Sequence, residues 1–106
     1  MKMFAWHASF LAVALAVQMS GRILTPNGDG IHDSVAFNLP NPVAGTPKTQ
    51  VYDVRGRRIA SLAAMSSTQW LWDGRDYSGR AVPSGVYLVQ ISEDSALWNG
   101  IVAVAR

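Results

Sequence analysis

The sequence predicts an all-β fold, a sandwich of two antiparallel sheets with about seven strands, preceded by an N-terminal signal-peptide helix. Three observations support this prediction. Residues that favour turns (Gly, Pro, Asn and Asp) recur every 8–12 residues after position 21. Short segments rich in branched and aromatic side chains lie between them. No helical pattern of ten or more residues follows position 21. Two packed sheets are favoured over a single antiparallel sheet, because the strands carry too many apolar residues to leave one face in water.

Composition limits the class of protein. The chain has 106 residues, which allows one domain, and 49% of them are hydrophobic, which is enough for a core. The absence of cysteine excludes disulfides, thiolate metal sites and cysteine nucleophiles. The formal net charge of +2 is too small for a nucleic-acid-binding surface, so no nucleic-acid partner is expected.

The first 21 residues differ from the rest and are predicted to be a signal peptide. Lys2 is followed by a nearly continuous apolar run from position 4 to 17, which is too short to cross a bilayer. The small residues at Ala14-Leu15-Ala16 offer one cleavage site, and Ser20-Gly21 offers a second. A buried amphipathic helix is the alternative. The predicted domain is 22–106, exported to the cell surface or exterior, with no membrane span in its mature form.

The first predicted strands are 22–24, which is short, and 34–39. In the second of these, Val35, Phe37 and Leu39 alternate with small or polar residues, which is the pattern of a strand with one buried face.

The middle of the body is predicted to hold two further strands, 49–54 and 58–62. The sequence Arg55-Gly56-Arg57 between them suits a tight turn. Residues 62–65 suggest a single helical turn.

The last three predicted strands are 69–72, 85–92 and 100–105. Tyr87, Val89 and Ile91 share one face of the second of these. Asn99-Gly100 is interpreted as the turn before the final strand, because Asn-Gly pairs favour hairpin turns.

Four motifs, in this order, resemble those of the gliding-motility-associated C-terminal domain of type IX secretion cargo proteins. Residues 25–33 are similar to the opening T-P-N-G-D-G-x-N-D, and residues 51–59 to a central strand-turn-strand. Residues 72–87 resemble W-D-G-x-x-x-x-G-x-x-[VL]-P-x-G-x-Y, and residues 100–106 resemble the closing strand. The related Ig-like domain of flagellar hook-capping proteins shares the central and closing motifs, and residues 35–40 look more like that relative.

The resemblance implies an Ig-like sandwich that binds protein partners of the secretion or envelope machinery through its edge strands. It implies sorting and attachment at a Gram-negative type of cell surface. The hook-cap relative instead implies a scaffold in an extracellular assembly. The family's domain usually follows a long cargo, whereas here it follows the leader directly. We therefore expect either a stand-alone protein or a fragment of a longer one.

Side chains suited to catalysis are scarce. His32 and Glu93 are the single histidine and glutamate after the leader, and the sequence has no nucleophile elbow. Asp73 and Asp76 form a carboxylate pair, but on one turn such residues more often accept backbone N–H groups. The sequence thus predicts no enzyme and no small-molecule substrate.

A calcium loop is the sharpest chemical hypothesis. Asn27, Asp29 and Asp33 have the spacing of oxygen ligands, and Ile31 would supply a carbonyl. The first position of such a loop, however, is Thr25 rather than a carboxylate. The alternative is that Asn-Gly and Asp-Gly form consecutive turns and that Asp33 caps a backbone amide. No other cofactor is expected.

The tryptophans have two interpretations. Trp70 and Trp72 share one face of a strand, and with Trp98 they could stack on sugar rings in a carbohydrate-binding or adhesion module. The favoured interpretation is that they are structural, with one of the strand pair in the core.

A set of residues in the third motif is assigned to turn formation. Asp73 is expected to hold the turn through its carboxylate. The arginines around two turns, at positions 55, 57, 58, 75 and 80, could form a basic ligand patch, but solvated turns are favoured. The predicted structural residues of the turn are Trp72, Asp73, Gly74, Gly79, Pro83 and Gly85.

The final strand is the predicted partner-binding element, because an unpaired strand edge can accept a strand from another chain. The residues assigned to this contact are Ile101, Val102, Ala103, Val104, Ala105 and Arg106.

Overall fold

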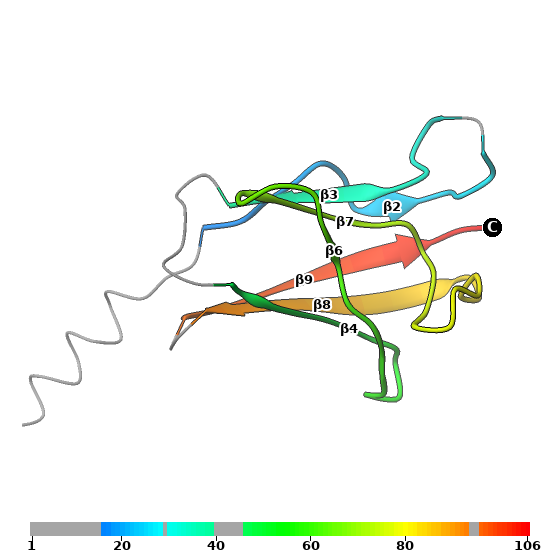
Figure 1. The fold of residues 1–106 in the computed structure, drawn as a ribbon. Coiled ribbons are helices and arrows are strands. Elements are labelled where there is room, and N and C mark those ends of the chain that lie inside the picture. The colour runs from blue at the N-terminus through cyan, green and yellow to red at the C-terminus, as the bar shows by residue number, and fades with distance from the viewer. Residues whose placement is uncertain (1–15, 29, 40–45, 94–95) are drawn as a thin grey trace, which may run out of the picture.

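The computed structural model describes residues 16–28, 30–39, 46–93 and 96–106. It confirms the all-β sandwich: two sheets face each other and enclose the core (Figure 1). The first sheet has the order β1-β3-β7-β6 and the second β2-β9-β8-β4-β5. The first sheet consists of β1 (Gln18–Met19), β3 (Val35–Asn38), β7 (Gln69–Trp72) and β6 (Ala63–Ala64). The second consists of β2 (Ile23–Leu24), β9 (Ala96–Val104), β8 (Gly85–Glu93), β4 (Lys48–Tyr52) and β5 (Arg58–Ala60).

The core forms where the alternating apolar faces of the two sheets meet. Val35 and Phe37 of β3 are buried, as the sequence alternation predicted, and so are Val89 and Ile91 of β8. Burying side chains of this size contributes roughly 1.5–3 kcal/mol each. The core is therefore built by the long β8–β9 hairpin on one side and by β3 and β7 on the other.

Two aromatic contacts hold the sheets together. Phe37 of β3 meets Trp98 of β9 edge to face, with ring centroids 5.9 Å apart. Trp72 of β7 meets Tyr87 of β8 in the same manner at 5.4 Å. Such pairs add to the free energy of burial because the ring edge is positive and the ring face is negative.

The N-terminal boundary of the sandwich differs from the sequence prediction. Gln18 and Met19, which were assigned to the leader, pair with Asn38 and Phe37 as β1. The predicted signal-peptide helix otherwise falls in residues 1–15, outside the described residues. Cleavage after Ala16 would retain β1, whereas cleavage after Ser20 would remove it.

Three local expectations were wrong. Residues 63–64 pair with β7 as β6 instead of forming a helical turn. The Asn99-Gly100 pair lies inside β9 rather than in a turn. The sheets are also not wholly antiparallel, since β2 runs parallel to β9. In the first two cases pairing with a neighbouring strand overrode a local preference.

No helix in the described part of the chain is both long enough and apolar enough to cross a membrane.

Candidate functional site

The loop that follows β7 is held by its own side chains. The indole Nε1–H of Trp72 donates to the carbonyl of Arg75 at 3.0 Å. The Oδ1 of Asp73 accepts the amide of Arg75 at 3.2 Å, and its Oδ2 forms a long ion pair with the same residue at 3.6 Å. The turn thus begins from a buried indole and is closed by an aspartate carboxylate, which is the geometry of an Asx turn.

Gly74 lies at the centre of this end of the sandwich. Its φ of +80° is in the left-handed region. A Cβ there would lie 2.9 Å from Cδ2 of Leu24, 3.3 Å from Nη2 of Arg106 and 3.7 Å from Cγ of Pro26. Both backbone conformation and space therefore require glycine, and segments from three of the four family-like motifs meet around this residue.

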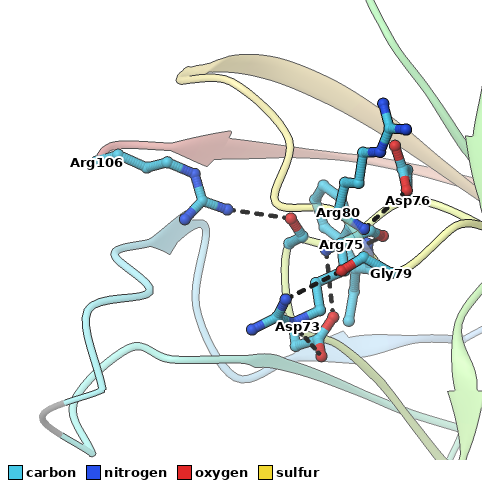
Figure 2. Close-up of polar contacts among 8 residues, drawn as sticks. Asp73, Arg75, Asp76, Gly79, Arg80 and Arg106 are labelled. Atoms are coloured by element: carbon cyan, nitrogen blue, oxygen red, sulfur yellow. Dashed lines mark hydrogen bonds and ion pairs between the residues drawn. The ribbon is translucent and has the colours of Figure 1, made fainter.

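Arg106 ties the C-terminal end of the chain to the same loop. Its Nε donates to the carbonyl of Val82 at 2.6 Å. Its Nη2 donates to the carbonyl of Gly74 at 3.1 Å (Figure 2). Its backbone amide donates to Oγ of Ser84 at 3.0 Å. The amide of Val82 in turn donates to the carbonyl of Gly74 at 2.9 Å, so a single guanidinium spans both sides of a closed loop.

The sequence pattern Asp-x-x-Gly-Arg forms two similar turns, one within this loop and one between β4 and β5. They are Asp53–Arg57 and Asp76–Arg80. In each, Oδ1 of the aspartate accepts the amides two and four residues later, at 2.9–3.0 Å. The fourth residue is a glycine with φ of +81° or +83°. The twin turns line one shallow groove of about 240 Å³ with Pro83 and Tyr87.

These hydrogen bonds alter the acidity of the two aspartates. The amide of Arg57 is the main cause that holds the pKa of Asp53 below its ordinary value. For Asp76 the hydroxyl of Ser78 is the main cause, followed by the amide of Arg80, and the pKa is again lowered. Hydrogen bonds to a carboxylate favour its charged form. Burial raises the pKa of Tyr87, whose hydroxyl donates to the carbonyl of Pro83 at 2.7 Å.

A second, larger groove of about 430 Å³ lies beside the Trp72 turn. Its walls include Ala60, Leu71, Arg75 and Tyr77. Tyr77 is 62% exposed there. Both grooves are open and are bordered by turns, so they suit contact with an extended or flat partner more than enclosure of a small molecule.

The residues of the predicted calcium loop are only partly brought together. Asp33 accepts the amide of Gly28 through Oδ1 at 3.1 Å and the amide of Gly30 through Oδ2 at 2.7 Å. The carbonyl of Ile31 is 3.4 Å from Oγ1 of Thr25, and Asn27 lies in the same turn. Asp29 lies outside the described residues. Asp33 therefore has the geometry of the turn interpretation, with both oxygens accepting amides.

No group of three or more His, Cys, Asp or Glu side chains that could hold a metal ion is present in the described part of the chain.

The residues predicted to bind a partner do not all lie at a free edge. Ala103 and Val104 have neighbours on both sides, β8 and β2. Val102 and Val104 face the core, and Arg106 is bound within the chain. Ile101 is 57% exposed and precedes the β2 pairing. The accessible edge of β9 thus lies mainly upstream of the predicted segment and shares only Ile101 with it.

The tryptophans take structural positions. Trp70 and Trp72 are both buried, and Trp98 is partly buried against Phe37. The first two indoles are not available to stack on a sugar.

Two features were missed from the sequence. The repeat of Asp-x-x-Gly-Arg at positions 53–57 and 76–80 is visible in the sequence and could have indicated twin turns. The sequence carries no local signal for the long open edge of β9, because an Asn-Gly pair ordinarily favours a turn.

Comparison with known proteins agrees with this fold. The sequence model of a family described as the FlgD Ig-like domain matches residues 22–96. No curated protein matches the sequence. Among solved structures, one similar chain comes from a study of PorZ, described as an essential bacterial surface component of the type IX secretion system of Porphyromonas gingivalis. The TM-score is 0.63 at 22% identity, over 86% of this chain and 12% of that one.

Proposed function

This chain belongs to the FlgD Ig-like domain family, and from that premise we propose that it is an exported, non-catalytic interaction module of a bacterial envelope. More specifically, we propose that it is a sorting and surface-attachment domain for the type IX secretion system. The four ordered motifs support this role, and so does the likeness of fold to part of a surface component of that system.

The observation that carries the proposal is the convergence of motifs at Gly74. Leu24, Pro26 and Arg106 all lie within 4 Å of a Cβ at this position. The opening turn, the 73–84 loop and the chain end lie together at one end of the sandwich (Figure 1). A rigid end built from these motifs gives a partner a fixed surface to recognise, because preorganisation lowers the entropy lost on binding.

A reporter fusion tests this role. The chain is attached to the C-terminus of a periplasmic reporter in a bacterium with a type IX system, and surface exposure is measured with external protease. We expect the fusion to reach the surface. An Arg106→Glu variant is expected to remain in the periplasm, whereas Arg58→Glu, on an exposed residue of β5, should behave like the parent. A parent fusion that stays in the periplasm would contradict the sorting role.

Export itself has a separate readout. Mass spectrometry of the mature chain should place the new N-terminus at Val17, because cleavage there leaves β1 paired with β3. An N-terminus at Gly21, or an uncleaved chain, would contradict that site.

A scaffold role in an extracellular assembly is the second candidate, and the family match itself favours it. It is distinguished from sorting by deleting the gene. Loss of an extracellular structure with normal export of other cargo would support the scaffold, and the reverse would support sorting. A carbohydrate-binding role is less well supported, because two of its three tryptophans are buried.

A further inference from the structure

One stretch of strand edge in the described part of the chain is long and unprotected. Of the four edge strands, β1, β2 and β6 have two residues each, while β5 has three, including a charged Arg58, beside a register shift in β4. β9 has nine residues, and β2 covers only its Ala103 and Val104. Natural sheets protect exposed edges with charge, proline, bulges or short length. Residues 97–101 have none of these features.

The direction of the open backbone groups follows from the register. The amides of Ala103 and Ala105 donate away from β8, to Arg22 and Leu24, at 2.9 Å. Because β9 pairs with β8 without a register shift, alternate residues point the same way. Leu97, Asn99 and Ile101 therefore direct their N–H and C=O groups outward, where no strand in the described part of the chain pairs with them.

The outer face of the sheet beside this edge is uncharged and carries two apolar side chains. Leu97 is 54% exposed and Ile101 is 57% exposed on the outer face of the sheet. Their β8 partners on that face are Ser92 and Leu88, and Asn99 lies between them opposite Gln90. On the inner side, a groove of about 490 Å³ runs along the edge, where Val17, Met19 and Trp98 line it together with the charged Arg22. An added strand would thus meet apolar side chains on its outer face and a mixed polar and apolar groove on its inner face.

The sequence of the open stretch is complementary to itself. If two copies of Leu97-Trp98-Asn99-Gly100-Ile101 run antiparallel with Asn99 opposite Asn99, each leucine faces an isoleucine and each tryptophan faces a glycine. The tryptophan–glycine pairs fall at the closely spaced positions that lack mutual hydrogen bonds, and each glycine there leaves room for the indole of its own chain. The asparagine and leucine–isoleucine pairs fall at the hydrogen-bonded positions.

We propose that a second copy of this chain pairs with residues 97–101 of β9, about a two-fold axis at Asn99, and joins the two larger sheets into one. This is an isologous interface formed by strand addition. The open stretch ends where β2 begins, so its length limits the pairing to these five residues. The inference does not depend on the sorting role, because it concerns self-association of the isolated chain.

Cysteine trapping tests the pairing, because the chain has no cysteine of its own. Asn99→Cys should form a disulfide-linked dimer under mild oxidation. Its control, Gln90→Cys, lies on the same face one strand further in, beyond the reach of a disulfide across the axis. Leu97→Cys and Ile101→Cys should each link poorly alone, and a mixture of the two should form mainly the heterodimer.

The reversible dimer is tested on the chain without cysteine. Sedimentation should show a dimer that Asn99→Pro abolishes, since this change removes an outward amide and leaves the β8 bonds intact. A cooperative thermal transition, with the midpoint that the parent has when diluted to a monomer, would show that the variant is folded.

The proposal is wrong if Asn99→Cys links no faster than Gln90→Cys, or if the mixed variants show no preference for the heterodimer. It is also wrong if the chain is monomeric at millimolar concentration. A chain that stays monomeric and binds only an unrelated peptide at this edge would likewise contradict it.

Discussion

The indole of Trp98 lies directly over Gly100, two residues further along β9. A Cβ at position 100 would be 2.2 Å from Cη2 of the indole and within 2.9 Å of two more ring atoms. The glycine leaves room for the far end of the indole, which also contacts Phe37 across the sandwich. This contact explains why an Asn-Gly pair lies in the middle of a strand.

The Gly100→Ala substitution tests this relationship. Alanine normally stabilises a strand relative to glycine by reducing the freedom of the unfolded chain. Here we expect the free energy of unfolding to fall by about 1–3 kcal/mol, because the indole must move. In a Trp98→Leu background the same substitution should cost little or become favourable. Urea unfolding of the parent, the two single variants and the double variant gives the coupling free energy between positions 98 and 100. Additive changes in the free energy of unfolding would contradict the contact.

Gly74 and Gly56 form a matched pair for a second prediction. Both have φ near +80°, but nothing lies within 4 Å of a Cβ at position 56. Gly56→Ala should cost about 1–2 kcal/mol from backbone conformation alone. Gly74→Ala should cost clearly more, because its Cβ overlaps Leu24 and crowds Arg106. Equal losses in thermal unfolding experiments would show that the Leu24 contact does not constrain this turn.

Arg106 is predicted to stabilise the 73–84 loop. Arg106→Ala removes two charged hydrogen bonds to carbonyls and should lower the free energy of unfolding by about 1–3 kcal/mol. Arg106→Lys should recover only part of this, since a lysine cannot fork across two carbonyls. Amide exchange at Val82 should accelerate in the alanine variant more than at Val89 in the core. Uniform acceleration at both sites would contradict a local role.

The lowered pKa values of Asp53 and Asp76 lead us to expect that the folded protein loses stability in acid. Their pKa values are lowered in the folded state by the hydrogen bonds that each carboxylate accepts. The stabilisation is therefore complete above the unfolded pKa, about 3.9, and is lost as the pH falls through the folded values. Asp53→Asn with Asp76→Asn keeps an acceptor at each turn but removes the charge. The thermal midpoint of this double variant should depend less on pH below about 4, and an unchanged acid dependence would argue against these two groups.

Substitution of Asp33 distinguishes a role in turn formation from a role in calcium binding. Because both of its carboxylate oxygens accept amides, Asp33→Ala should lower the thermal midpoint equally with calcium and with a chelator. The parent chain should melt at the same temperature in both buffers. A midpoint that rises with calcium in the parent but not in Asp33→Ala would restore the calcium interpretation.

The sequence by itself determined the all-β class, most strands and the core alternation. Val35 and Phe37, or Val89 and Ile91, repeat every second residue, and this period leaves a strand only one face to bury. The sequence also indicated the turn residues, because a positive φ favours glycine, as at Gly79, and an Asx hydrogen bond needs a residue such as Asp76.

Only the tertiary structure decided how the ends of the chain and the edges of the sheets are used. Met19 became a strand because Phe37 offered a partner, and Gly100 stayed extended because Trp98 covers it. Arg106 found its carbonyls in a loop more than twenty residues away. The Met19 and Arg106 contacts join residues distant in sequence, and local preferences worth under about 1 kcal/mol yield to such pairing and packing.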